Sequence, residues 1–488
     1  MNGKSLHGFL VCCFVMMIFP LKFIASAQSE SKDTSEQQTS STPAVVVPPR
    51  AEGYRGIWYM NQPSKDEYRY KYSGGLGTYC AKHHPMAQYA PEADKTFFVY
   101  GGTKGVGTSE SLLIMISYFD HKTGLVPKPA ILMEKGTEDA HHNPTLTIDK
   151  SGHIWVFVSS HGKESGFIWK STDPYSIDSF EQIAQKEFTY PQPWYYDGFG
   201  FMFLFTKYTA GRELYMNTSP DGRTWGEDKK CVGFGGHYQL SWGYKNKRGT
   251  AFNWHPSQGG VNARTNLYYM ETEDYGETWV TAAGKPLTLP LDNPENDALV
   301  RNYYEENQLV YLKDLNFDDE GRPVVLVVLS KGYESGPKND PRIWTVAHWT
   351  GSEWRFHPVT TSDHNYDMGS LYIEEDGTWR IIAPTAPGPQ AYCTGGEVAM
   401  WTSTDQGETW KKTRQLTNNS PRNHTYVRRP RAAHPDFYAF WADGNALEPS
   451  VSRIYFTDKE GKRVRVLPET MTQDYEAPCL LEDSASSR

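Results

Sequence analysis

Two histidines stand at the ends of a predicted β-hairpin in the first third of the chain. The segment 141–149 starts one expected strand and contains His142, and the next expected strand ends just before His161. Since neighbouring antiparallel strands start and end at the same sheet edge, both imidazoles are expected to face one pocket. Tyr208 ends a similar apolar strand further along the chain, and Arg223 follows it inside a turn.

These residue types suit β-elimination from a uronic acid. The C5 proton of a uronate is only weakly acidic, so its carboxylate must be neutralised or hydrogen-bonded before the proton can leave. Arginine or histidine supplies that contact, tyrosine or histidine accepts the proton, and another donor protonates the departing oxygen. No cofactor is required. Each residue also has an ordinary explanation, because histidines at strand ends commonly hydrogen-bond to loops and arginines decorate turns.

Two other groups of residues are candidates for binding roles. Arg264 and Tyr268 are candidates for contacts with a carboxylate and a sugar ring, or else structural. His364, Cys393 and His424 recur at loop positions and are zinc-ligand types, so a structural zinc is one hypothesis. The alternative is a buried thiol and loop-bonding histidines, since no closely spaced ligand pair supports a metal.

A short motif recurs along the chain and indicates repeated tight turns. Its pattern is Ser/Thr-x-Asp-x-Gly-x-Thr-Trp, with copies at residues 403–410 and 272–279 and a shorter one at 219–225. The aspartate accepts turn amides, the glycine adopts a positive φ, and the tryptophan packs beside the turn. Degenerate copies start near Ser171 and Phe456. Two near-identical copies in one chain favour a repeat protein.

Seven apolar segment pairs, each joined by a polar turn, alternate with these motifs. They cover residues 89–100, 147–158, 194–205, 239–254, 315–329, 371–382 and 433–441. Their spacing of roughly 45–75 residues is that of a four-stranded propeller blade, and no long stretch keeps a helical period. The sequence therefore predicts an all-β, seven-bladed β-propeller over residues 51–470, with a six-bladed ring or a two-sheet sandwich as the alternative.

The two ends of the chain differ from this repeated middle. Lys4, a short apolar run and the small residues 25–27 predict a cleaved signal peptide over residues 1–27, against an uncleaved anchor. Residues 28–50 have the polar composition of a disordered tether, and residues 471–488 are expected to form a loose tail. A secreted or periplasmic location follows from the signal peptide.

Charge and cysteine content limit the classes of partner. The chain has 488 residues, with 49 Lys and Arg against 58 Asp and Glu, and a formal net charge of -9. This mild acidity disfavours a nucleic-acid partner, and the apolar N-terminal run is too short for a comfortable membrane span. The four cysteines beyond the signal peptide are widely spaced, so their pairing stays open. We expect a monomer.

The motif copies and three further segments carry a family resemblance. Together with residues 74–83, 363–367 and 423–430, the copies resemble secreted BNR-repeat propellers. That family includes propeller-type ulvan lyases and rhamnosidases that release rhamnose from glucuronic acid. The resemblance covers nearly all of the chain after the tether, but the motif copies are structural and do not discriminate between functions.

Different functions follow from the different relatives. Resemblance to the ulvan lyases implies a histidine pair, a tyrosine and an arginine as the catalytic set, at His142, His161, Tyr208 and Arg223. It also implies a lyase or a dehydratase that acts on an acidic rhamnose- and uronate-containing polysaccharide or its oligosaccharides. Resemblance to the rhamnosidases implies instead a site at His83, on the opposite propeller face. A non-catalytic sugar-binding propeller is the third hypothesis.

Overall fold

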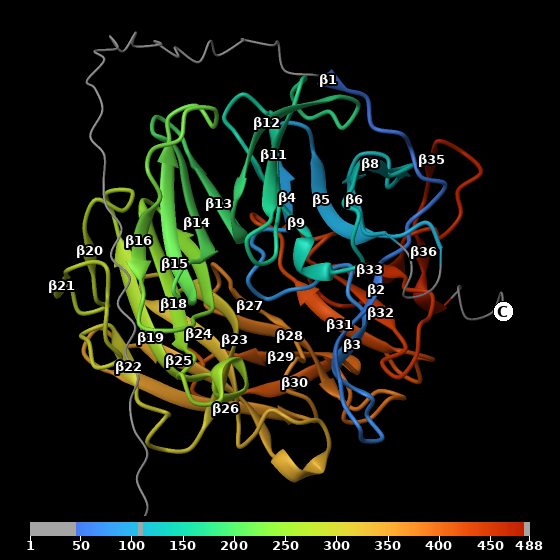
Figure 1. The fold of residues 1–488 in the computed structure, drawn as a ribbon. Coiled ribbons are helices and arrows are strands. Elements are labelled where there is room, and N and C mark those ends of the chain that lie inside the picture. The colour runs from blue at the N-terminus through green and yellow to red at the C-terminus, as the bar shows by residue number, and fades with distance from the viewer. Residues whose placement is uncertain (1–44, 106–110, 483–488) are drawn as a thin grey trace, which may run out of the picture. The chain divides into compact units, whose positions relative to one another are not determined.

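Antiparallel β-sheet accounts for nearly all regular structure in the computed structural model, which describes residues 45–105 and 111–482 (Figure 1). All of these residues belong to one compact unit of the chain, residues 43–488. Three single 3-10 turns interrupt the strands: η1 (Ala140–His142), η2 (Gly260–Ala263) and η3 (Pro337–Asn339). No helix in the described ranges is long and apolar enough to cross a membrane.

Seven sheets form the blades of a β-propeller, numbered here in chain order. Blade 1 contains β4 (Ala87–Ala90), β5 (Lys95–Gly102), β6 (Leu113–Asp120) and β8 (Ala130–Glu134). Blade 2 contains β9 (Pro144–Ile148), β10 (Ile154–Val158), β11 (Ser165–Ser171) and β12 (Phe180–Glu187). Blade 3 contains β13 (Thr189–Tyr196), β14 (Gly200–Tyr208), β15 (Arg212–Ser219) and β16 (Lys229–Val232). Blade 4 contains β17 (Gln239–Tyr244), β18 (Lys247–Trp254), β19 (Thr265–Thr272), β20 (Trp279–Val280), β21 (Pro286–Leu287) and β22 (Leu299–Arg301). Blade 5 contains β23 (Leu309–Phe317), β24 (Pro323–Ser330), β25 (Arg342–Trp349) and β26 (Trp354–Ser362). Blade 6 contains β27 (Ser370–Ile373), β28 (Trp379–Ala386), β29 (Glu397–Ser403) and β30 (Lys411–Gln415). Blade 7 contains β31 (Asn423–Arg428), β32 (Ala439–Gly444), β33 (Ile454–Thr457), β34 (Val464–Val466) and β36 (Cys479–Leu480).

The first strands of successive blades contact one another and thus line the propeller axis. Gln192 of β13 donates from its amide to the carbonyl of Gln239 in β17, at 3.1 Å. Asn316 of β23 makes the same kind of bond to Leu371 of β27, at 3.0 Å. Because these side chains satisfy backbone groups of the neighbouring blade, they fix the distance between blades at the axis.

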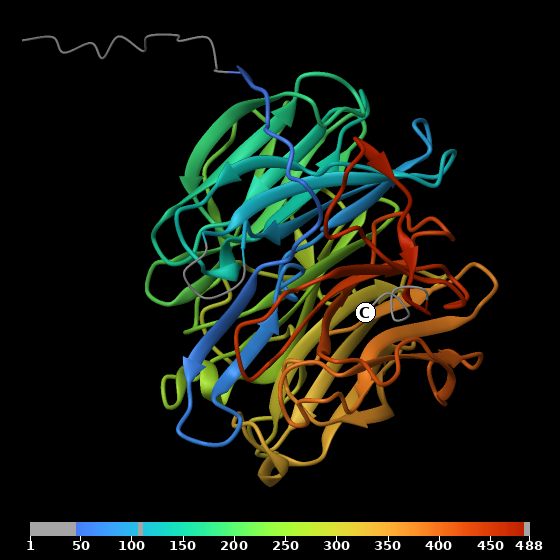
Figure 2. The ribbon, with the colours of Figure 1, turned by 90° about the vertical axis from the view of Figure 1, so that its right-hand side faces the viewer.

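Segments from both ends of the chain close the ring between blades 7 and 1. The amide of Arg431, after β31, donates to the carbonyl of Ala87 in β4, at 2.8 Å. The β35 strand (Tyr475–Glu476) pairs with β7 (Val126–Pro127), and β36 pairs with β34. The blue and red parts of the ribbon accordingly lie side by side in Figure 2. Although a loose tail is expected from residue 471 onwards, its described part is therefore held by strand pairing.

The remaining described strands of the N-terminal region form a separate hairpin and one added edge strand of blade 2. The β2 strand (Trp58–Pro63) forms a hairpin with β3 (Tyr70–Gly75), and β1 (Val45–Val46), within the predicted tether, pairs with β12. The predicted signal peptide, and the tether as far as residue 44, lie outside the described residues.

The predicted all-β, seven-bladed propeller is confirmed, with one misplaced hairpin. Six of the seven predicted segment pairs span the first two strands of a blade. The seventh, over residues 433–441, is wrong in its first half, because the first strand of blade 7 is β31 and residues 433–438 form the loop to β32. The strand was missed because Asn423–Arg428 is largely polar in sequence although fully buried.

The recurrent motif forms the turn between the third and fourth strands of a blade. In the copy after β29, the Ser403 hydroxyl accepts the amide of Gly407 at 2.9 Å, and Asp405 accepts the amide of Thr409 at 3.0 Å. Gly407 has φ +83°, a conformation that disfavours residues with a Cβ atom. The copy after β19 repeats these bonds, so the expectation of a tight glycine turn is confirmed.

Candidate active site

One pocket gathers aromatic, basic and histidine side chains from several blades. It has about 450 Å³ of empty space, part of which is open to solvent. Its lining residues are Asn61, Gln62, Lys71, Tyr72, Tyr79, Lys82, His141, His161, Arg212, Tyr238, Val261, Arg264 and Tyr366. We call it the histidine pocket.

A carboxylate joins the two histidines of this pocket. Asp139 is the N-cap of η1, where its side chain accepts the backbone N–H of His141 at 2.9 Å. The same carboxylate accepts Nδ1–H of His141 and, through its other oxygen, Nδ1–H of His161 at 2.7 Å. The two rings stack with centroids 4.1 Å apart. The β9–β10 hairpin thus brings both imidazoles to one anion.

The two imidazoles differ in what their other nitrogen contacts. Nε2 of His141 lies 2.7 Å from the hydroxyl of Tyr79 and 3.0 Å from that of Tyr72. Within the described ranges, no protein group hydrogen-bonds to Nε2 of His161, whose side chain is 29% exposed. In the neutral imidazole, donation of Nδ1–H to Asp139 leaves the lone pair on Nε2, and His161 lines the pocket.

The protonation states follow from burial and from this carboxylate. Burial opposes ionisation of Asp139, but its contacts with His141 and His161 outweigh burial and hold the Asp139 pKa below its usual range. Burial lowers the pKa of His141 to about 4 despite the neighbouring carboxylate. At neutral pH an ionised Asp139 therefore lies behind the pocket wall, beside a neutral His141.

Cations surround a single tyrosine on another wall of the pocket. The Tyr238 ring centroid lies 4.0 Å from Nζ of Lys82, 5.0 Å from Cζ of Arg264 and 5.6 Å from Cζ of Arg212. Burial alone would raise the pKa of Tyr238, but these three cations outweigh burial and lower it. Cations grouped around a phenol in this way favour negative charge in the pocket.

The basic side chains of the pocket also repel one another. Burial, together with Arg264 and Arg212, lowers the pKa of Lys71 to about 7. Burial lowers the pKa of Lys82 as well. Arg264 has no carboxylate partner in the described part of the chain, and its Nη2 donates to the hydroxyl of Tyr366 at 2.9 Å. Two arginines and two lysines with lowered pKa values thus lie near one carboxylate, which already accepts from the histidines. An anionic ligand would pair with the arginines and favour the protonated lysines.

Tyr208 and Arg212 form a pair at the edge of blade 3. They are opposite partners in the β14–β15 register, and Nε of Arg212 donates to the Tyr208 hydroxyl at 3.1 Å. The Tyr208 ring lies 6.1 Å from that of His161, edge to face. Burial raises the pKa of Tyr208 although Arg212 opposes the rise, so the phenol stays protonated at neutral pH.

Comparison with known proteins assigns the family. A family profile described as "BNR repeat-containing family member" matches residues 118–362, from β6 to the end of blade 5. The chain belongs to the BNR repeat-containing family. This match covers half of the chain and shows membership rather than an activity.

Individual relatives of this BNR-repeat protein include ulvan lyases. An ulvan lyase of family PL25 from Pseudoalteromonas sp. (strain PLSV) is 23% identical over an alignment of 288 residues; the match covers 49% of this chain and 58% of that protein. The solved structure of a PL25 ulvan lyase bound to -[GlcA(1-4)Rha3S]- superposes with a TM-score of 0.66, at 15% identity, covering 84% of this chain and 96% of the other. The polysaccharide lyase Uly1 superposes with a TM-score of 0.58, at 11% identity, covering 84% and 100%. At these identities the structures support the fold.

The BNR-repeat protein brings together three of the residues predicted from sequence. His161 and Arg264 line the histidine pocket, and Tyr208 contacts both His161 and Arg212. His142 does not line the pocket, because the adjacent His141 occupies that place. Its own ring is 2% exposed, is perpendicular to that of His161 and has Nε2 3.5 Å from Glu164.

Arg223 is also placed elsewhere. Its guanidinium forms an ion pair with Glu181 on the exposed side of the motif turn after β15. The pocket arginine beside Tyr208 is Arg212, and the signal that could have identified it is its position directly across the β14–β15 turn from Tyr208. Lys71 and Tyr238 were missed because their segments carry no motif, and Lys82 was missed although it lies in the segment 74–83 that carries the family resemblance.

Tyr268 and His83 are buried away from the pocket. Tyr268 stacks on Phe252 at 4.9 Å and donates to the carbonyl of Pro294, so its role is packing. His83 has no exposed surface, and its Nδ1 lies 3.2 Å from the carbonyl of Tyr79. A substrate would not reach His83 in this conformation, which disfavours the site that the rhamnosidase resemblance implies.

The predicted zinc residues do not converge. His424 lies in blade 7, where Nδ1 accepts Nε1–H of Trp441 at 2.9 Å and Nε2 contacts Ser420. His364 and Cys393 are buried near β27 and β29, and burial raises the pKa of the Cys393 thiol to about 12. Over the described ranges, the sets of converging metal-ligand atoms are His121, His434 and Asp436, and Asp139, His141 and His161. The three predicted ligands therefore form no common site.

Proposed function

We propose that this BNR-repeat protein is a polysaccharide lyase that cleaves a uronate-containing acidic polysaccharide by β-elimination in the histidine pocket. The observation that carries the proposal is the combination of an aspartate-held imidazole, His161, with the basic side chains Lys71, Lys82, Arg212 and Arg264. The relatives that are named ulvan lyases support the same reaction class. The proposed substrate is of the ulvan type, built from rhamnose and uronate, and the proposed location is outside the cytoplasm.

The cations would bind the uronate carboxylate and make its neighbouring C–H acidic. Arg264 is held by its bonds to Tyr366 and to the carbonyl of Val261, so its guanidinium is fixed before substrate arrives. Negative charge moves onto the carboxylate as the C5 proton leaves. Preorganised cations stabilise that charge more than they stabilise the ground state, and this difference lowers the barrier.

His161 would act as the base and Tyr208 as the acid. Nε2 of His161 takes the C5 proton, the electron pair forms the C4=C5 double bond, and the C4–O bond breaks. The departing oxygen takes the phenolic proton of Tyr208, and Arg212 stabilises the resulting phenolate through its 3.1 Å contact. Asp139 stabilises the imidazolium that forms, and proton exchange with water restores both groups.

Activity on an acidic oligosaccharide tests the proposal, with absorbance of the unsaturated uronate as the readout. We expect Arg212→Ala to reduce the rate by about 10²–10³, as for loss of one preorganised charge donor, and Arg223→Ala, an exposed arginine outside the pocket, to leave it unchanged. A rise in absorbance that survives in His161→Ala would contradict the proposed base.

The same assay separates the other functions. Release of free rhamnose without absorbance, abolished in His83→Ala, would replace elimination by hydrolysis. Retained binding with neither product would identify a sugar-binding propeller. Elimination from a polymer and loss of water from a terminal uronate share the same deprotonation, so the sizes of the products distinguish a lyase from a dehydratase.

A further inference from the structure

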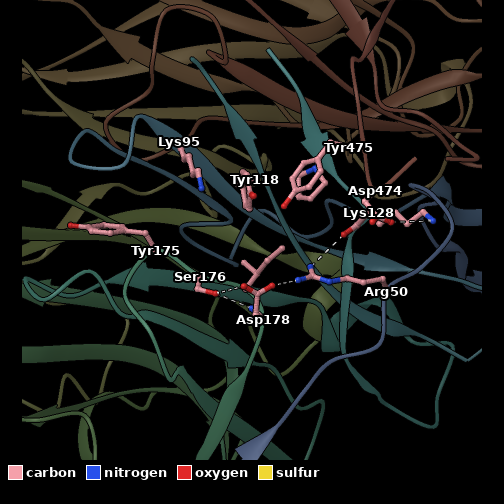
Figure 3. Close-up of a pocket in the computed structure, with 11 residues that line it drawn as sticks. Arg50, Lys95, Tyr118, Lys128, Tyr175, Ser176, Asp178, Asp474 and Tyr475 are labelled. Carbon is pink, nitrogen blue, oxygen red and sulfur yellow. Dashed lines mark hydrogen bonds and ion pairs between the residues drawn. The ribbon is translucent and has the colours of Figure 1, made fainter. Parts of the chain in front are cut away.

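A second cleft lies between blades 1 and 2 and shares no lining residue with the histidine pocket (Figure 3). It contains about 1030 Å³ of empty space, including its open mouth. Four separate chain segments form it: the region of Arg50, blade 1 with Lys95 and Tyr118, the β11–β12 turn with Tyr175, and the C-terminal strand β35 with Tyr475. We call it the outer cleft.

Tyrosines supply the flat surfaces of the outer cleft. Tyr475 is 55% exposed, and it is held in place because β35 pairs with β7, with Tyr475 opposite Pro127. Among the described residues, the exposed large hydrophobic side chains include two aromatics, Tyr475 and Tyr304. Tyr118 and Tyr475 lie close to one another in Figure 3, with Tyr175 on another side of the cleft. An apolar ring face with a polar edge is suited to packing against a sugar ring.

The charges of the outer cleft leave one cation without a carboxylate. Arg50 forms an ion pair with Asp178, and Nζ of Lys128 lies 3.6 Å from Asp474. Lys95 has no carboxylate partner in the described part of the chain, and its Nζ lies 4.2 Å from the centroid of the Tyr118 ring. Three cations face two carboxylates here, in a chain with a net charge of -9. The cleft therefore favours a ligand that carries negative charge.

We propose that the outer cleft is a second glycan-binding site, which holds an acidic stretch of polysaccharide by stacking on Tyr475 and by an ion pair to Lys95. The class of polymer rests on the proposed function, whereas the site itself does not depend on catalysis. A polymer that occupies both sites is retained after each cleavage, because linked contacts raise the effective concentration of the chain.

Affinity for the polymer tests this proposal, measured by retardation in native gels that contain ulvan, with dextran as the neutral probe. The His161→Ala background keeps the polymer intact. We expect Tyr475→Ala to weaken polymer binding by about threefold to tenfold, as for loss of one aromatic contact, and Lys95→Gln to weaken it less at high salt than at low salt. The equally exposed Tyr304→Ala is the matched control and should behave as the parent.

The outcomes separate the two proposals. Tyr475→Ala in the active chain should retain the elimination rate on a short oligosaccharide, since Tyr475 does not line the histidine pocket. Equal retardation of Tyr475→Ala, Lys95→Gln and the parent would overturn the outer cleft as a site, and equal retardation in dextran would overturn its charge preference. If retardation of the His161→Ala background depends on Tyr475, but the chain with His161 intact forms no unsaturated product, the proposed function is contradicted and the outer cleft is supported as a binding site.

Discussion

Replacement of Asp139 by asparagine removes the charge that the two pocket histidines share, with little change in volume. The side-chain amide of asparagine has one acceptor oxygen, so it cannot accept Nδ1–H from both His141 and His161. If its NH₂ group faces His161, the imidazole must carry its proton on Nε2, and the proposed base loses its lone pair. If it does not, His161 still loses the anion that stabilises its protonated state.

The size of the effect follows from the contact geometry. Asp139 lies 2.7 Å from Nδ1 of His161, and opposite charges about 4 Å apart interact by about 4 kcal/mol at an effective dielectric constant of about 20. Since His161 is partly exposed, solvent screens part of this energy. We therefore expect kcat to fall by about 10²–10³, at 1.4 kcal/mol for each factor of ten. KM should change little, because Asp139 does not line the pocket.

The assay is the initial rate of absorbance increase on an acidic oligosaccharide, measured over a range of substrate concentrations. Asp197→Asn is the control, because Asp197 is an exposed aspartate whose one ion pair within the described ranges is with Lys150. Thermal unfolding of Asp139→Asn checks that the variant is folded. A folded variant with kcat within about threefold of the parent would refute the role of Asp139 in orienting the base, since that is less than 1 kcal/mol.

Three further outcomes are expected from the same contacts. Burial lowers the pKa of His142 to about 3, so on acidification the unfolded state binds the proton of this group before the folded state does. The free energy of unfolding should therefore fall as pH drops from about 6.5 to about 3. Chemical denaturation of His142→Gln should show a shallower fall of this free energy with pH, with kcat unchanged. Ultraviolet titration should show a tyrosine that ionises below the usual range, and this step should vanish in Tyr238→Phe; its persistence would contradict the cationic setting. Gly407→Ala should lower the free energy of unfolding by more than about 1 kcal/mol, because φ is +83° and a Cβ atom would lie 2.7 Å from the Trp379 ring. Gly377→Ala should lower it by less, because this glycine has φ +82° but open space around it. Equal shifts of the denaturant midpoint in the two variants would contradict the role of the Trp379 contact.

The propeller could be predicted from local signals, but the pocket could be predicted only in part. The motif turns and alternating strands are short-range patterns, and all but one of the seven predicted segment pairs lie on the first two strands of a blade. His161 and Tyr208 could be identified because strand ends are visible in sequence. His141 and His142 could not be told apart, since adjacent residues differ only in the direction set by η1 and its Asp139 cap.

The cationic wall depends on long-range closure of the ring. Lys82, Arg212 and Arg264 come from the segments before blade 1, within blade 3 and within blade 4, and only the closed propeller brings them around Tyr238. Arg223 illustrates the converse, because a charged residue inside a conspicuous motif serves the turn and its ion pair with Glu181.

The origin of the oxygen in the product tests the central claim most directly. The cleavage of an acidic oligosaccharide is run in water enriched in the heavy oxygen isotope, and the products are weighed by mass spectrometry. Elimination breaks the C4–O bond without adding water, so we predict an unsaturated uronate product that carries no heavy oxygen at the cleavage site. Incorporation of heavy oxygen into a saturated product would contradict the account.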